Sequence, residues 1–512
     1  MMKFNLLSKF NNRTVNHEGA KAYQLSPEME LYAAVVTWSL NDSFYEKDQT
    51  RLVRLRELIA QCNPTFVGKL AVYARTKMYM RSVPLVLTTE LAHLHRGDGL
   101  VARVTEGVVN RADEITELLA CYQQLNTRTG TKKLNRLSKQ MQKGLSAAFN
   151  RFDEYQFAKY NRDSSIKLRD ALFLVHPKAA SHVQQQIFDK IVNGTLQTPY
   201  TWETELSAIG QLNYDNAEAK AMAFRSKWEE LIDSGKLGYM ALLRNLRNIQ
   251  QAGVSYAHFE KVCARLADAD EVARAKQFPF RYLAAYRELL ADNKAVGNKG
   301  YTGQLLDVLE KAVQASAANI KGFGPATSVL LACDVSGSMQ TPVSANSKIL
   351  LYDVGLMLAM LLQSRCKNVE VGMFGDTWKT IMVPNSHILG NVQELYRREG
   401  GVGYSTNGYL VVKDLLQRCV KMDKVMLFTD CQLWNSRQTA DDIQTLWVRY
   451  KAEVAPEARL YLFDLKGYGQ APLQVLNNGV YLVAGWSDKV FEALAALEAG
   501  GTALNAINNM EL

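Results

Sequence analysis

From residue 26 to about residue 318 the chain reads as one helix after another, and this long helical region constrains the fold more than any other feature. Ser26 is a preferred N-cap, and Pro27 suits the first helical position because an N–H there would be unpaired anyway. Apolar residues recur three or four positions apart, as at Leu305, Leu309 and Val313. No run of alternating β-branched residues appears in the region. Many short helices without strands predict stacked helix pairs, an α-solenoid.

The pattern changes at NIKGFGPATS, residues 319–328. Beyond it, short apolar runs alternate with amphipathic helical segments. Such strands are too apolar to have a solvent-exposed face. Because helices separate them, they predict a mostly parallel sheet with helices on both faces. The sequence therefore predicts a multidomain α + α/β protein, with a helical module over 1–320 and a doubly wound, Rossmann-like domain over 321–512. The expected strands are SVLLACD, VEVGMF, TIMV, KVMLFTD, RLYLFDL and GVYLVAG, and the expected final helix is DKVFEALAAL.

The excess of positive over negative charge is confined to the helical region. The 512 residues carry a formal charge of +9; residues 1–320 hold 43 Lys and Arg against 33 Asp and Glu, whereas residues 321–512 hold 17 against 18. This basic excess predicts a polyanionic partner for the helical module. The N-terminus lacks the apolar core of a signal peptide, and no window approaches the ~20 apolar residues of a membrane span. We therefore expect a cytoplasmic protein without a membrane partner.

The seven cysteines are scattered singly along the chain, with no CxxC pair and no short Cys/His spacing. This pattern argues against zinc sites and against a disulfide framework. We expect buried free thiols.

Oxygen-bearing side chains follow the predicted strands of the second domain. Asp334, Ser336 and Ser338 follow the first strand, Asp430 ends KVMLFTD, and Thr406 lies in the Gly-rich GGVGYSTNG. Because ligand crevices in such sheets lie at the carboxyl ends of the strands, we expect these side chains to converge. Two carboxylates and three hydroxyls offer only hard oxygen ligands, which suit Mg²⁺ or another divalent cation. The alternative is that the hydroxyls only cap helices and Asp430 only ends a strand.

Three stretches of the helical module combine cations with residues that can contact bases. They are 127–144, where four cations form a stripe opposite apolar residues, 158–179, where cations surround Tyr160, and 239–254. Arg and Lys can neutralise phosphates, and Asn, His and Tyr can read or stack on unpaired bases. A charge stripe can equally be a solvated face, and Pro177 alone would explain a helix end at His176. The predicted RNA-binding residues are Lys132, Arg136, Lys139, Lys143, Lys159, Arg162, His176, Lys178, Arg244, Asn245 and Arg247.

The order of the oxygen ligands, DxSxS followed by Thr406 and Asp430, resembles the metal-ion-dependent adhesion site of von Willebrand factor A domains. This resemblance implies that Ser336 and Ser338 would ligate the cation directly, and Thr406 directly or through water. Asp334 and Asp430 would act mainly through waters or as outer acceptors. The remaining position on the cation would take an acidic group from a partner.

Nearly the whole chain is similar to the TROVE-module family, that of the Ro autoantigen and its bacterial orthologues. The likeness rests on NHEGAKAYQLSPEMELY, KLRDALFLVHPKA, GYMALLRNLRNI, FPFRYLAAY and DVSGSM, in this order. It implies a ring of HEAT-like helical repeats closed by a von Willebrand A domain. It also implies binding of small structured Y-type non-coding RNA on an outer basic surface, and of single-stranded ends of defective RNA in the central hole. The implied role is RNA quality control or tethering of an exoribonuclease, without catalysis and without a DNA partner.

By the same resemblance, Lys159 and His176 match basic positions on the RNA-binding face of the family. Where the family has another arginine after KY, this chain has Arg162 followed by Asp163, so that contact is expected to be shifted or weakened. Arg244 and Asn245 fall in the RNL stretch of the module.

Two other functions fit parts of the sequence. A cytosolic scaffold working with an ATPase chaperone would use the cation to capture an acidic partner, but the basic helical region weighs against it. A Mg²⁺-dependent hydrolase would need carboxylates that bridge two ions ~4 Å apart, and a hydroxyl-rich site offers too little negative charge for that. Because no base or nucleophile stands near the oxygen cluster, we expect that the protein is not an enzyme.

Overall fold

The computed structural model describes residues 13–17, 19–38, 48–125, 137–161, 165–291, 299–316, 326–343, 347–434, 441–475, 478–485, 494 and 504–512. These residues form two compact units. The sheet unit contains the described residues of 1–55, 320–486 and 490–504, and the helical unit contains those of 56–319 and 505–512. The N-terminal segment therefore belongs to the same unit as the C-terminal sheet. The predicted division at residue 320 had placed this segment in the helical module.

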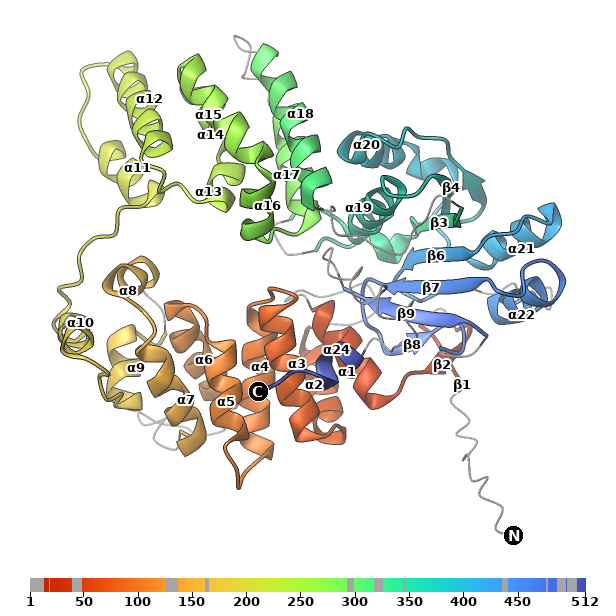
Figure 1. Ribbon diagram of the computed structural model, residues 1–512, viewed down its shortest axis with the longest axis horizontal. Helices are drawn as coiled ribbons and strands as arrows, with labels where there is room; N and C mark the ends of the chain where they lie inside the picture. Colours follow the sequence, from red (N-terminus) through yellow and green to blue (C-terminus); the bar gives the residue numbers. More distant parts are fainter. Residues whose placement is uncertain are drawn as a thin grey trace. The chain divides into compact units, whose positions relative to one another are not determined.

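The sheet unit contains strands and helices from both ends of the chain (Figure 1). They are β1 (Arg13–Val15), β2 (Lys21–Gln24), α1 (Pro27–Val36), the first part of α2 (Asp48–Gln61), β3 (Ser328–Asp334), η1 (Gly337–Gln340), α19 (Leu351–Gln363), β4 (Asn368–Phe374), β5 (Trp378–Thr380), α20 (Ile388–Arg398), η2 (Glu399–Gly401), α21 (Tyr409–Arg418), β6 (Lys424–Thr429), α22 (Ile443–Glu453), β7 (Arg459–Asp464), β8 (Gln470–Ala471) and β9 (Val480–Ala484).

The main sheet has six strands in the order β5-β4-β3-β6-β7-β9. All neighbouring strands are parallel except β5, which pairs antiparallel with β4 at the edge. Every residue of β6 is buried, and α19 contacts both β3 and β6. A central strand without an exposed residue is covered on both faces. The predicted mostly parallel, doubly covered sheet is confirmed.

Two details of the predicted sheet differ. The edge strand is β5 and not TIMV, because only Thr380 belongs to both and the chain leaves the sheet after the N–H of Ile381 donates to the carbonyl of Val371. Met382 is 97% exposed, and Pro384, two residues later, has no N–H to donate to a ladder. The structure also contains α20, which the sequence pattern did not predict. The expected final helix DKVFEALAAL falls largely outside the described residues.

A second, three-stranded sheet joins the N-terminal hairpin to the C-terminal region. β1 and β2 pair antiparallel, and β2 pairs with β8. Downstream, Ser26 accepts a hydrogen bond from the backbone N–H of Met29 and Pro27 begins α1, so the predicted cap is confirmed. Arg51 is buried and donates to the backbone oxygens of Thr37 and Lys466. The N-terminal segment is thereby tied to the loop that follows β7.

The helical unit is helical throughout its described residues, as the sequence predicts, apart from the connecting segments. Its helices are the last part of α2, α3 (Pro64–Thr76), α4 (Ser82–Leu94), α5 (Leu100–Val108), α6 (Ala112–Leu125), α7 (Lys139–Phe149), α8 (Glu154–Tyr160), α9 (Leu168–Val175), α10 (His182–Asn193), α11 (Trp202–Gly210), α12 (Ala217–Asp233), α13 (Tyr239–Arg244), α14 (Leu246–Ala252), α15 (Tyr256–Ala267), α16 (Ala269–Ala275), α17 (Pro279–Leu290), α18 (Lys299–Ser316) and α24 (Asn505–Asn508).

Helices of this unit stack on their neighbours in two rows (Figure 1). In one row α3, α5 and α7 follow one another, and in the other α6 contacts α4 before it and α8 and α9 after it. Leu100, Val104 and Leu145 fill the interface within the first row. Nearest-neighbour stacking of this kind is how helical solenoids bury their apolar faces. HEAT-type repeats and a closed ring stay predictions.

None of the described helices combines the length and the apolar content that a membrane crossing would require.

A cluster of ion pairs holds α3 and α6 together around the residues that precede α4. Glu114 is fully buried and lies 2.8 Å from Arg75. Arg81 lies 3.0 Å from Asp113 and also contacts Glu117. Because Glu114 has no water around it, its charge depends on these arginines.

Replacing Glu114 by alanine should therefore lower the free energy of unfolding of the helical unit by about 3–5 kcal/mol, because it leaves Arg75, whose side chain is only 11% exposed, without its counter-charge. Urea unfolding followed by circular dichroism measures the loss. Glu117→Gln is the matched control, since its carboxylate is 43% exposed and should cost less than ~1 kcal/mol. Equal losses in the two variants would contradict the role given to burial.

Candidate functional site

Two carboxylates lie at the carboxyl edge of the main sheet. Asp334 ends β3 and Asp430 follows β6, and these strands are parallel neighbours in which Cys333 pairs with Phe428. Both carboxylates are buried. The hydroxyl of Thr429 donates a 2.6 Å hydrogen bond to Oδ2 of Asp334. The sequence predicted both acids but not the supporting role of Thr429.

The predicted hydroxyl ligands approach these acids from two loops. The backbone N–H of Ser336 donates to Oδ1 of Asp334, and the hydroxyls of Ser336 and Ser338 are 3.2 Å apart. The N–H of Gly337 donates to the carbonyl of Tyr404, two residues before Thr406. On the other side, the N–H of Trp434 donates to the carbonyl of Thr406. The structure thus connects all five predicted oxygen-bearing residues, and all five are buried.

The five side chains offer only oxygen atoms, which are the ligands that a hard cation prefers. The hydroxyl oxygen of Thr406 is buried and has no hydrogen-bond partner among the described residues. No described group of three or more His, Cys, Asp or Glu residues could hold a metal. A cation here would therefore depend on the serine and threonine hydroxyls together with two carboxylates, a set that fits Mg²⁺ and its waters.

Burial and mutual repulsion act on the protonation of the acids. Burial, and then the negative charge of Asp430, raise the pKa of Asp334 to about 7, against the hydrogen bonds from Ser336 and Thr429. A positive ion beside the two carboxylates would relieve this repulsion and favour the charged form of Asp334.

A third buried carboxylate, Asp464, ends β7 and was not predicted as part of the site. Burial raises its pKa to about 6, although the N–H groups of Lys466 and Gly467 donate to its Oδ1. The negative charge of Asp430 acts in the same direction as burial, which places the two acids near each other. The sequence did carry a signal, because the apolar run in RLYLFDL leads to an acid, as it does in SVLLACD and KVMLFTD.

The N-terminal hairpin holds the loop that follows Asp430. The side chain of Asn16 donates a 2.7 Å hydrogen bond to the carbonyl of Leu433, and the N–H of His17 donates to the side chain of Gln432. Gln432 in turn donates its backbone N–H to Asp430. This support could not be predicted, because no local pattern links residues so far apart.

The structure brings four of the predicted basic residues together on α7 and the loop 176–181. Lys139 and Lys143 are exposed on α7, and His176 and Lys178 are exposed in the loop. Gln142 donates to the carbonyl of Val175, which lies directly before His176. No described acidic residue forms an ion pair with any of these four residues. We call these four residues the α7 basic surface.

Asn150 fixes the loop to the end of α7. Its side chain donates to the carbonyls of Ser146 and Lys178 and accepts from the N–H of Ala180. His176 adopts a left-handed conformation with φ 49° at the end of α9, as a residue before proline that cannot continue the helix. The backbone that carries the cations is therefore well defined.

The predicted RNA-binding stretch 239–254 is only partly available to a ligand. Asn245 is 2% exposed, and its side chain bonds to the carbonyl of Ala241 and to Asn248 at the break between α13 and α14. Its burial does not fit the predicted RNA contact. Arg247 pairs with Glu288 at 2.8 Å, and both side chains remain partly exposed.

Arg244 is exposed and has a neighbouring cation that the sequence did not single out. Burial, and then the positive charge of Arg244, lower the pKa of Arg281 on α17. No described acidic residue forms an ion pair with either arginine. Lys159 is exposed on α8 between two tyrosine rings. Lys132, Arg136 and Arg162 lie outside the described residues.

The comparison with protein families matches this helical region. The model of the TROVE domain matches residues 33–221 and 194–300, which together span more than half of the chain. The chain belongs to the TROVE-domain family. The α7 basic surface and Arg244 both lie within the matched residues.

Individual relatives agree with this assignment. Telomerase protein component 1 of Rattus norvegicus is 27% identical over an alignment of 311 residues, which takes in 45% of this chain and 11% of the rat protein. The Mus musculus protein of the same name is 28% identical over 323 residues, with 47% and 12% covered. The chain thus corresponds to a small part of these relatives. The crystal structure of the Deinococcus radiodurans Ro (RSR) protein is similar in fold, with a TM-score of 0.59 at 16% identity, over 92% of this chain and 100% of that one.

Replacing Asn150 by alanine should loosen the loop that carries His176 and Lys178, because three hydrogen bonds are lost. We expect faster hydrogen exchange at the amide of Ala180 and a loss of about 1–3 kcal/mol of stability. Exchange mass spectrometry measures the first and denaturant unfolding the second. Gln185→Ala on α10 is the control, since that exposed side chain bonds only to Asp189 among the described residues; unchanged exchange in Asn150→Ala would contradict the anchoring role.

Proposed function

We propose that this chain is a non-catalytic RNA-binding protein of the Ro type, which holds a small structured non-coding RNA, similar to Y RNA, on the α7 basic surface. The observation that carries the proposal is the grouping of three exposed lysines, Lys139, Lys143 and Lys178, with the exposed imidazole of His176, without described acidic partners. Phosphate groups would supply the missing negative charge. The similarity in fold to the Deinococcus Ro protein and membership of the TROVE-domain family support the same proposal.

The proposal includes a second RNA ligand, the single-stranded ends of defective RNA, received in the hole of a ring. Arg244 and Arg281 are the cations proposed to hold the phosphates of such an end, since Arg244 is exposed and the two positive charges repel one another. An anion between them would relieve that repulsion. An exoribonuclease that acts on the held RNA is the proposed partner in quality control.

For the sheet unit we propose a cation site of the von Willebrand A type. Ser336, Ser338 and Thr406 would offer hydroxyl oxygens to Mg²⁺, and Asp334 and Asp430 would offer carboxylates, directly or through waters. The unpartnered hydroxyl of Thr406 supports the proposal. A bound cation would supply a position for one more oxygen ligand, and Tyr404, which is 50% exposed, marks the side from which an acidic group could approach. Capture of an acidic partner protein is therefore the second candidate function.

Replacing Lys139, Lys143 and Lys178 together by glutamine should weaken binding of a structured RNA at least ~10-fold and make the slope of log K against log salt shallower by about 2–3, because about one counterion is released per phosphate contact. Filter binding over a salt series measures both quantities. Lys220→Gln with Lys367→Gln is the matched control, since both lysines are exposed outside the surface. Unchanged affinity and slope in the triple variant would remove this surface from the proposal.

Adding Mg²⁺ to protein treated with EDTA should raise the melting temperature of the sheet unit, because a ligand that binds only the folded state stabilises it by about 2.7 kcal/mol at ~100 times its Kd. Thr406→Val and Asp430→Asn should lose most of this gain. Thr445→Val, which removes an exposed hydroxyl from α22, should keep it. Differential scanning calorimetry measures the melting temperature. An equal wild-type melting temperature with and without Mg²⁺ would contradict the cation site.

A further inference from the structure

Tyrosine rings and cations alternate in the first part of one surface feature of the helical unit, in the order Arg111, Tyr160, Lys159 and Tyr155. The guanidinium of Arg111, just before α6, lies 4.2 Å from the ring centre of Tyr160 on α8. The ammonium of Lys159 lies 5.7 Å from that ring and 5.5 Å from the ring of Tyr155, one helical turn away. A single ammonium therefore lies near two rings, and a guanidinium also lies near one of them.

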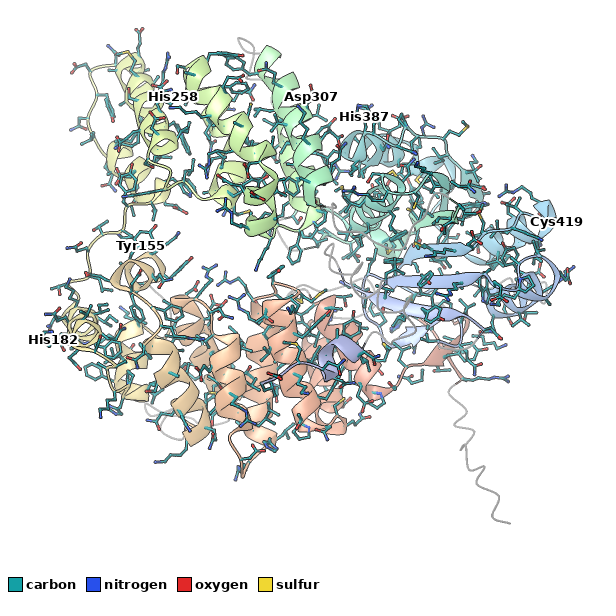
Figure 2. All side chains as sticks on the ribbon, viewed as in Figure 1. Tyr155, His182, His258, Asp307, His387 and Cys419 are labelled. Atoms are coloured by element: carbon teal, nitrogen blue, oxygen red, sulfur yellow. The ribbon has the colours of Figure 1, made fainter. Side chains whose placement is uncertain are left out.

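The row continues across the segment that joins α10 to α11. The hydroxyl of Tyr155, labelled in Figure 2 on α8, lies 3.5 Å from the backbone carbonyl of Tyr200. The ammonium of Lys236, in the turn after α12, lies 5.0 Å from the ring of Tyr200. Three segments that are distant in sequence thus contribute to one surface feature. We call it the tyrosine–cation row: Arg111, Tyr160, Lys159, Tyr155, Tyr200 and Lys236.

The ends of the row are anchored, and its middle is exposed. Arg111 pairs with Asp113, and the hydroxyl of Tyr200 donates to Glu230. In contrast, Tyr155 is 43% exposed, and Lys159 is exposed with no ion pair to a described acid. An exposed ring held beside an unneutralised cation contributes little to folding, since cation–π contacts at the surface are worth only ~0.5–1 kcal/mol. The middle of the row is thus free to contact a ligand.

We propose that the tyrosine–cation row binds unpaired nucleotides of a single-stranded RNA. Bases would stack on the rings of Tyr155 and its neighbours, and phosphates would lie near Lys159 and Lys236. This inference rests on the proposed RNA-binding function and deepens it, because it assigns unpaired RNA to named residues that are not part of the α7 basic surface.

The alternation of rings and charges is what favours a single strand. Successive nucleotides present a flat base and a phosphate in turn, so a surface that alternates rings and cations matches both. The bases of an RNA duplex are stacked within the helix and cannot reach the rings. An acidic peptide would satisfy the cations but leave the rings without a partner. The row therefore fits unpaired RNA better than either alternative.

The test compares single strands with and without bases on the full-length protein. A fluorescent oligouridylate of about 12 nucleotides is titrated beside an abasic strand of equal length, which keeps the phosphates and lacks the stacking faces. The wild type should bind the base-bearing strand roughly tenfold more tightly or better, in line with the stacking of one or more bases. Tyr155→Ala should lose most of this preference, and Tyr155→Phe should keep it.

The dependence on salt separates rings from charges. Tyr155→Ala should weaken binding without changing the slope of log K against log salt, whereas Lys159→Gln should make that slope shallower by about 0.7, the value for one phosphate of a single strand. Tyr256→Ala is the matched control, since Tyr256 on α15 is 56% exposed and belongs to no such row. Melting temperatures of all variants should match the wild type.

Several outcomes would overturn the inference. Equal wild-type affinity for the base-bearing and abasic strands would show that the rings do not stack on bases. Full binding by Tyr155→Ala would show the same, and competition by polyglutamate as strong as by the base-bearing strand would assign the row to an acidic protein. Retained binding of structured RNA in these cases would leave the proposed function intact. Failure of the wild type to bind any RNA would instead contradict the proposed function itself.

Discussion

The sheet unit depends on carboxylates that are buried side by side at the ends of parallel strands. A buried charge is costly unless hydrogen bonds or an opposite charge compensate it. The neighbouring chain segments provide that compensation: the hydroxyl of Thr429 and the backbone N–H of Ser336 serve Asp334, and the N–H of Gln432 serves Asp430. The register of β3 and β6 therefore depends on the loops around them, since a shift of either strand would separate an acid from its hydrogen-bond donors.

Charged residues of the helical unit fall into two groups, paired ones in the interior and unpaired ones on the surface. Inside, acids and arginines such as Glu114 and Arg75 neutralise one another and hold helices together. On the surface, cations of α7, the loop 176–181 and α8 are left without described acidic partners, although the unit is not short of acids. This contrast between paired interior charges and unpaired surface cations is a physical basis for polyanion binding that net charge alone does not provide.

The sequence was most informative where the physical rule is local. Helical spacing predicted the helices, and the position of acids and hydroxyls after buried strands predicted which five residues the structure connects at the sheet edge. TIMV failed because an exposed Met382 and Pro384 outweigh the strand propensity of three apolar residues. The RNA contact predicted for Asn245 does not fit its burial, because the side chain of an asparagine at a helix break can bond to the backbone instead of to a ligand. The tyrosine–cation row draws on three segments, so only tertiary structure reveals it. The bound cation and RNA remain predictions.

The N-terminal hairpin has a consequence for how the protein is made. Asn16 finds its partner Leu433 only 417 positions later in the chain, and β2 pairs with β8 at a similar separation. During synthesis, residues 13–24 must therefore wait while nearly the whole helical unit is produced and begins to fold. Contacts of such high sequence separation form slowly, because the loop between them must be closed first. Completion of the sheet unit is thus a late step in biogenesis, and the oxygen cluster beside the hairpin is among the last parts of the molecule to take shape.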